Sequence, residues 1–157
     1  MTIASFMALL AAFGVAMGYA EAVVVYYLRR LLDLVPLPDD IDPATITQVD
    51  QRVLAVEQTR EAATIIMLLA LAIASGRNTW QRVGAFLFTF GVWDIFYYVG
   101  LKTLLGWPDS LSAPDLLFLI PRPWYAPVWM PILVSVAMIV MGGLCIRRGA
   151  RQRVRQQ

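Results

Sequence analysis

Long runs of apolar residues constrain this chain more than any other feature of its sequence. Of its 157 residues, 59% are hydrophobic and only 15% are charged, and the mean hydropathy is +0.65. Soluble domains usually carry about 25% charged residues, whereas an apolar run of about 20 residues can cross the hydrocarbon core of a bilayer as a helix. The sequence therefore predicts an all-α, polytopic membrane protein with one membrane domain.

Four segments have the length and composition of membrane-spanning helices, which predicts a four-helix bundle. The second segment must include charged residues, because its cleanly apolar part, residues 62–75, is too short to cross alone. The predicted spans are residues 3–28, 56–75, 79–105 and 126–146.

The connections between the spans carry their own signals. Asp42-Pro43 is a typical helix start, so the outer loop, residues 29–55, is expected to contain a long amphipathic extension of the second helix. The apolar run 116–120 is bounded by prolines and is too short to cross, which predicts an interfacial or re-entrant cap over residues 107–125. The apolar stripe of the extension consists of Ile46, Val49, Val53 and Val56.

Basic residues are unevenly placed on the two sides of this bundle. An even number of spans puts both termini on one side, and that side has only basic charges, whereas all eleven acidic residues lie in or beyond the outer half. In membrane proteins, the short segments next to the ends of the spans are richer in Lys and Arg on the cytoplasmic side. We therefore expect both termini to be cytoplasmic, with the basic tail, residues 147–157, near anionic lipid. The basic residues of that side are Arg77, Arg82, Arg147, Arg148, Arg151, Arg153 and Arg155.

Three carboxylates fall at a similar depth in three different spans. At 1.5 Å per helical residue, Glu21 lies roughly 27 Å, Glu61 roughly 21 Å and Asp94 roughly 22 Å from the cytoplasmic side. A carboxylate in hydrocarbon costs roughly 2.5–3.5 kcal/mol on insertion scales, so such groups pair, face a cavity or have a function. Gly18 and Gly91 share helix faces with the acids of their spans, as expected where helices approach closely. The sequence therefore predicts an outward-facing carboxylate site between helices.

Several roles are open to these acids. Glu21, Glu61 and Asp94 are candidate ligand-binding residues, and their oxygens would suit a divalent cation such as Mg, Ca or Mn. Glu61 and Asp94 are also candidate catalytic acids or bases. A structural ion-pair network is the alternative, and Glu57 is expected to pair with Arg60, three residues along the same helix. Other basic residues within reach of this layer are Arg29, Arg30, Lys102 and Arg122, of which Arg122, like Arg60, could hold an anionic head group.

Aromatic residues crowd the same level. Tyr97 and Tyr98 are candidate ligand-binding residues, because their hydroxyls could donate hydrogen bonds to the carboxylates. Trp107, Trp124 and Trp129 are expected to form an interfacial aromatic belt.

Some classes of protein are excluded by composition. The chain has no histidine, so no haem or other metal ligated by histidine, and no Ser-His-Asp triad, is expected. The single cysteine, Cys145, cannot form an internal disulfide. A net charge of +2 without an aromatic-interleaved basic stripe gives no indication of a nucleic-acid partner.

The strings FGVWDIFYY (90–98), LFLIPRPW (117–124) and PV (127–128) are distinctive. In these segments the chain resembles a group of small bacterial integral membrane proteins to which no activity is attached. The resemblance implies a bacterial inner membrane location and nothing about mechanism.

Three functions fit the sequence. The first is binding or transport of a cation, or of a cationic or amphiphilic ligand, at the carboxylate cluster. The second is an intramembrane enzyme that acts on a lipid or isoprenoid through carboxylate acid–base chemistry. The third is a small accessory subunit of a larger membrane complex. The expected partners are the lipid bilayer and either a second copy of the chain or such a complex.

Overall fold

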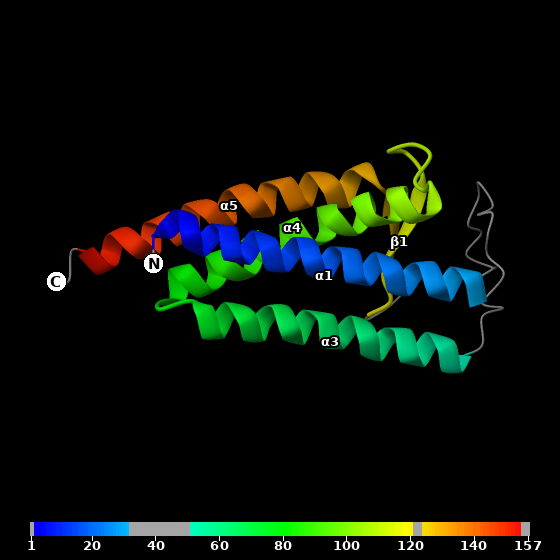
Figure 1. Ribbon diagram of the computed structural model, residues 1–157, viewed down its shortest axis with the longest axis horizontal. Helices are drawn as coiled ribbons and strands as arrows, with labels where there is room; N and C mark the ends of the chain where they lie inside the picture. The colour runs from blue at the N-terminus through cyan, green and yellow to red at the C-terminus, as the bar shows by residue number, and fades with distance from the viewer. Residues whose placement is uncertain (1, 32–50, 121–123, 155–157) are drawn as a thin grey trace.

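Four long helices and one hairpin make up the part of the chain that the structure describes, residues 2–31, 51–120 and 124–154. The structure is a computed structural model (Figure 1). Each of these four helices is long and apolar enough to cross a membrane. The predicted all-α, four-helix membrane bundle is confirmed. The helices are α1 (Ile3–Leu31), α3 (Gln51–Ser75), α4 (Thr79–Leu105) and α5 (Trp129–Val154).

The first and last helices of the chain, α1 and α5, extend beyond the C-terminal ends of the predicted spans. α1 continues to Leu31 instead of ending at residue 28. α5 continues to Val154, so most of the segment predicted as a basic tail belongs to the last turns of this helix. α5 also begins at Trp129, and the predicted start at residue 126 was wrong because Trp124–Pro127 form a strand.

Only part of the predicted extension of the second helix can be compared with the structure. α3 begins at Gln51 within the described residues, whereas Asp42-Pro43, Ile46 and Val49 lie outside them. Val53 is half-buried and lines the cavity described below, and Val56 is 63% exposed.

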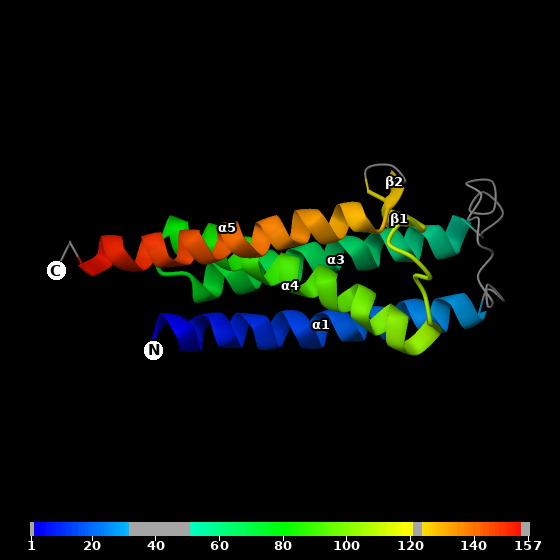
Figure 2. The ribbon, with the colours of Figure 1, turned by 90° about the horizontal axis from the view of Figure 1, so that it is seen from above.

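α4 is the central helix of the bundle. It packs along both α1 and α5, and less extensively against α3 (Figure 2). Both termini lie at one end of the molecule, together with the turn between α3 and α4, as four crossings require (Figure 1). The hairpin lies toward the opposite end (Figure 2).

Glycines set the close approach of α4 to its two main neighbours. A Cβ added to Gly18 of α1 would lie 2.5 Å from the carbonyl oxygen of Trp93 and 2.9 Å from the backbone nitrogen of Tyr97. On another face of α4, a Cβ on Gly91 would lie 2.5 Å from the carbonyl oxygen of Ser135 in α5. Both helix pairs therefore meet backbone to backbone, which agrees with the expected close approach at these residues.

The turn between α3 and α4 is tied to the C-terminal part of α5. Asn78 caps α4 by accepting a hydrogen bond from the backbone N–H of Gln81 (2.9 Å). Its side-chain amide also donates to the carbonyl of Gly149 in α5 (2.9 Å). At its other end α4 stops at Gly106, whose φ of 73° is accessible to glycine at little steric cost.

The predicted cap between α4 and α5 contains a two-stranded antiparallel hairpin. β1 (Pro114–Phe118) pairs with β2 (Trp124–Pro127), with Asp115 opposite Ala126. Pro114 and Pro127 face each other at the end of the ladder, where the missing proline N–H costs least. The N–H groups of Val128 and Trp129 then donate to the carbonyls of Ala113 and Leu111, so the hairpin leads directly into α5.

We predict that Gly18→Ala will destabilise the bundle, because the added methyl meets backbone atoms of α4 that cannot move without separating the helices. Overpacking of this kind costs roughly 1–3 kcal/mol. Thermal unfolding in detergent measures the effect. Gly143→Ala is the matched control: its Cβ would meet only the flexible end of Met7, at 3.4 Å, and its unfolding temperature should not fall. Equal unfolding temperatures for the two variants would contradict the prediction.

Candidate functional site

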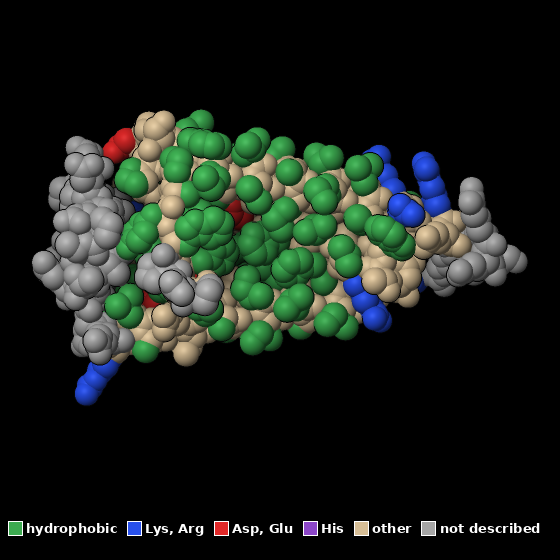
Figure 3. Space-filling model, turned by 180° about the vertical axis from the view of Figure 1, so that it is seen from behind, with side chains coloured by type: hydrophobic (Ala, Val, Ile, Leu, Met, Phe, Trp, Pro, Cys, Tyr) green, Lys and Arg blue, Asp and Glu red, His purple; other side chains and the backbone are tan. Residues whose placement is uncertain are grey.

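A cavity of about 390 Å³ lies between the N-terminal half of α3 and the rest of the bundle. Its walls are mostly apolar, with Val25 from α1, Phe90 and Trp93 from α4, Phe118 from the hairpin and Met138 from α5. Seen from behind, the molecule presents a nearly continuous hydrophobic face in which an acidic side chain is recessed (Figure 3). The charged and phenolic residues on the cavity wall are Glu21, Arg29, Glu57, Arg60, Glu61, Asp94, Tyr97, Tyr98 and Asp115.

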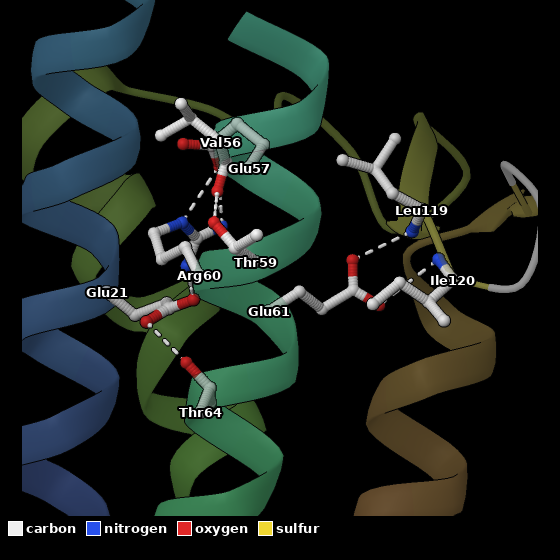
Figure 4. Close-up of polar contacts among 9 residues, drawn as sticks. All are labelled: Glu21, Val56, Glu57, Thr59, Arg60, Glu61, Thr64, Leu119 and Ile120. Carbon is white, nitrogen blue, oxygen red and sulfur yellow. Dashed lines mark hydrogen bonds and ion pairs between the residues drawn. The ribbon is translucent and has the colours of Figure 1, made fainter. Parts of the chain in front are cut away.

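Arg60 links α3 to α1. Its guanidinium forms an ion pair with Glu21 of α1 and a second one, at 2.8 Å, with Glu57 one turn earlier on α3 (Figure 4). Thr64 also donates a hydrogen bond to Glu21, at 3.5 Å. The predicted Glu57–Arg60 pair is confirmed. Glu21 is not a free carboxylate, because it forms an ion pair with the same arginine.

Glu61 points away from Arg60 and holds the hairpin. Its two carboxylate oxygens accept hydrogen bonds from consecutive backbone N–H groups, those of Leu119 (2.8 Å) and Ile120 (3.4 Å) (Figure 4). These amides lie just past the end of β1, where the ladder has no partner to offer them. Glu61 of α3 therefore supplies the hydrogen-bond acceptors that the hairpin itself lacks.

Asp94 lies on the α4 side of the cavity and has a single described partner. The hydroxyl of the buried Ser135, on α5, donates to its carboxylate at 2.8 Å. Within the described residues, no Lys or Arg lies within ion-pair distance of Asp94. Of the three acids predicted at this depth, Glu21 pairs with Arg60 and Glu61 accepts from two backbone N–H groups, whereas Asp94 has one neutral hydroxyl as its described partner.

Trp93 precedes Asp94 and adds a polar group to the same wall. The residue is 7% exposed, and its indole N–H has no hydrogen-bond acceptor among the described residues. Phe90 packs edge-on against its ring, with the centroids 5.1 Å apart. The cavity wall therefore has an unsatisfied indole N–H in the residue next to Asp94.

The hairpin contributes a fifth acid, Asp115, that sequence reasoning did not single out. Asp115 is buried, and the hydroxyl of Tyr98 donates a hydrogen bond to it at 2.6 Å. Burial raises the pKa of Asp115 above its ordinary value of 3.8, although the hydrogen bond from Tyr98, the charge of Arg29 and the N–H of Leu116 oppose this rise. Tyr98 does donate to a carboxylate, but to this one and not to Glu21, Glu61 or Asp94.

The basic residues of this region have distinct environments. Arg29 stacks over Trp107, and Arg30 over Tyr26, with guanidinium-to-centroid distances of 4.7 and 5.4 Å. Lys102 donates to the carbonyls of Gly106 and Pro108 at the end of its own helix. Arg60 is thus the basic side chain that forms ion pairs with the predicted acids in the described structure. Arg122 lies outside the described residues.

The predicted acids share one cavity but not one ion-binding point. Glu21, Glu61 and Asp94 all line it, as their depth in the helices indicated. In the described ranges, however, there is no group of three or more Asp, Glu or Cys side chains close enough to hold a metal ion. Their separate partners explain this: an arginine, two backbone amides and a serine hold them apart. The oxygen-ligated cation suggested by the sequence therefore has no three-acid site in this arrangement.

The tryptophans fit the expected aromatic belt only in part. Trp124 and Trp129 are exposed, as a belt requires, but Trp107 is 6% exposed and packs in an apolar cluster with Val25 and Leu101. The prediction for Trp107 was wrong because Arg29 and Tyr98 cover its ring.

Comparison with family models, with curated proteins and with solved structures finds no match to this chain. The resemblance to small bacterial membrane proteins accordingly stays a prediction, and the candidate site is interpreted from its own geometry.

We predict that Glu61→Gln will loosen the hairpin, because an amide nitrogen cannot accept a hydrogen bond from Leu119 or Ile120. Hydrogen bonds to charged groups contribute roughly 1.5–3 kcal/mol, so the amides of these two residues should exchange with deuterium about tenfold faster or more. The matched control is Glu57→Gln on the same helix, which should leave their exchange unchanged. The prediction is contradicted if the amides of Leu119 and Ile120 exchange at the same rate in Glu61→Gln as in the wild type.

We also predict a pH-dependent effect of Asp115. Because its pKa is raised in the folded protein, its contribution to stability is complete below about 3.8 and is lost as the pH rises through the raised pKa. The unfolding temperature of the wild type should therefore fall relative to that of Asp115→Asn between pH 4 and pH 7. Asp109→Asn, at an exposed position in the same connection, is the control and should run parallel to the wild type. The prediction is refuted if the unfolding temperatures of Asp115→Asn and the wild type change in parallel between pH 4 and pH 7.

Proposed function

We propose that the protein binds an amphiphilic ligand with a cationic group in the cavity between α3 and the other helices. The apolar part of the ligand lies against the apolar walls, and its cationic group lies at Asp94. The observation that carries this proposal is the state of Asp94, a carboxylate on the wall of an apolar cavity with no described cation to balance it.

The size and lining of the cavity support this class of ligand. Small-molecule sites are typically about 300–1,000 Å³, mostly apolar, with a few polar groups that fix orientation. A volume of about 390 Å³ is in that range, and it suits a short head group or part of an acyl chain. Small ions alone would not need the walls of Val25, Phe90 and Met138.

The partners of the other acids also support a binding role at Asp94. Glu21 and Glu57 share Arg60, and Glu61 is occupied by two backbone donors. These contacts hold α3 and the hairpin in place around the cavity. Of the two candidate catalytic acids, Glu61 is thus committed to structure, which favours binding over acid–base catalysis as the function of the site.

The location of the protein belongs to the same proposal. We place it in a bacterial inner membrane with both termini in the cytoplasm, where the arginines at the end of α5 meet anionic lipid. In that orientation the cavity lies in the outer leaflet. Lipid-soluble ligands reach this depth from the bilayer, and the nearly continuous hydrophobic face around the recessed acid supports entry from that side (Figure 3).

Binding of a simple cationic amphiphile tests the proposal. Dodecyltrimethylammonium, titrated into the purified protein in neutral maltoside micelles, should change the fluorescence of Trp93 in the cavity wall. Asp94→Asn should weaken its binding about tenfold, the equivalent of about 1.4 kcal/mol for loss of one charged partner.

The control for this experiment is Asp109→Asn, which removes an exposed carboxylate at the same end of the molecule and should bind as the wild type does. Identical affinity in Asp94→Asn and the wild type would refute the assignment of the cationic group to Asp94. Absence of binding to the wild type would refute the proposed function itself.

A further inference from the structure

Arg29 has surroundings that its position in the sequence does not explain. It lies in the last turn of α1, where an arginine ordinarily extends its side chain to the surface and keeps its charge in water. Here the residue is only 8% exposed and lines the cavity instead. Its neighbour Arg30 is exposed, so the same turn of helix carries both arrangements.

The guanidinium of Arg29 is incompletely satisfied. It stacks on Trp107, 4.7 Å from the ring centroid, but its buried Nη1 has no hydrogen-bond acceptor among the described residues. Asp115, on which the charge of Arg29 acts, already accepts a hydrogen bond from Tyr98 and is not within ion-pair distance of Arg29. An arginine stays protonated in proteins, and a buried charge without a full partner is costly. The free donor therefore points to a missing anion.

The two arginines of the cavity differ in their acidic partners. Each has an Nη1 without a hydrogen bond, but Arg60 forms ion pairs with Glu21 and Glu57, whereas no described acid lies within ion-pair distance of Arg29. Asp94 presents the opposite case, a carboxylate without a described cation. One cavity thus contains an unbalanced acid, an unsatisfied guanidinium and apolar walls between helices.

We propose that Arg29 is a second subsite of this cavity, which binds the anionic group of a zwitterionic amphiphile. The ligand would carry a phosphate for the guanidinium, an ammonium group for Asp94 and an acyl chain for the apolar walls, as a zwitterionic phospholipid does. A guanidinium is well matched to phosphate, because its fork donates two parallel hydrogen bonds. This inference rests on the proposed function and narrows its ligand from any cationic amphiphile to a zwitterionic one.

Two amphiphiles with the same tail test the inference without altering the protein. Dodecylphosphocholine and dodecyltrimethylammonium share the dodecyl chain and the trimethylammonium group, and the former adds a phosphate. In neutral maltoside micelles the wild type should bind dodecylphosphocholine about tenfold more tightly, as expected for one charged hydrogen-bonding partner. Equal or weaker binding of dodecylphosphocholine would overturn the Arg29 subsite, while binding of dodecyltrimethylammonium would still support the proposed function.

Two variants test whether Arg29 causes the preference for dodecylphosphocholine. Arg29→Gln should bind dodecyltrimethylammonium as before and lose the tenfold preference for dodecylphosphocholine. Arg30→Gln is the matched control, because it removes one charge from the next residue, which is exposed and stacks on Tyr26. A preference that persists in Arg29→Gln, or disappears in Arg30→Gln, would refute the assignment.

A charge-preserving variant and a free anion complete the test. If Arg29→Gln does not fold, Arg29→Lys can replace it, because lysine keeps the charge without the planar guanidinium. Its preference for dodecylphosphocholine over dodecyltrimethylammonium should fall between onefold and tenfold. A full tenfold preference in Arg29→Lys would contradict recognition of the phosphate by two parallel hydrogen bonds. Inorganic phosphate at millimolar concentration should not displace dodecylphosphocholine, because it lacks the chain that the apolar walls bind. Displacement by inorganic phosphate would overturn the lipid as the source of the anion.

Discussion

The contact between Arg60 and Glu21 is the interaction on which the shape of the site depends. α3 packs closely against α4 only in part, and no glycine of α3 brings it against α1 or α5. Its N-terminal half is held at a distance from its neighbours by long charged side chains, with Arg60 bound to α1 and Glu61 bound to the hairpin. Long polar side chains keep helices further apart than glycines do, so the space between them remains as a cavity.

The three remaining helices show the opposite design. α1 and α5 approach the backbone of α4 through Gly18 and Gly91, at distances that exclude even a methyl group. Such close contacts provide the dispersion energy and backbone proximity that hold helices together in a bilayer, where no hydrophobic effect between helices assists. The bundle thus combines three helices in close backbone contact with a fourth, α3, whose C-terminal half packs through Leu68 and Ala72 and whose N-terminal half is attached through ionic and hydrogen-bonded contacts.

How much of this was accessible from sequence depends on the range of each interaction. The depths of Glu21, Glu61 and Asp94 follow from the fixed rise of a helix, and the Glu57–Arg60 pair from a spacing of three residues. These local regularities correctly predicted that Glu21, Glu61 and Asp94 line one space between the helices and that Glu57 pairs with Arg60.

The partners of these acids were not predictable in the same way. Whether Glu61 meets an arginine or the backbone of the hairpin depends on helix rotation and on the fold of the cap, neither of which has a local signature. The segment Pro114–Phe118 lacks the alternation and the β-branched residues that usually indicate a strand, so the hairpin, and with it the buried Asp115, gave no signal.

Arg60 and Glu61 are consecutive in sequence, and this has a geometric consequence. Neighbouring residues on an α-helix project about 100° apart. One of them reaches α1 and the other the hairpin, so the two contacts pull in different directions around the axis of α3 (Figure 4). A single contact would leave the helix free to swivel about that point, whereas two at this angle define one rotational setting. That setting determines which side chains of α3 line the cavity and which ones face the lipid.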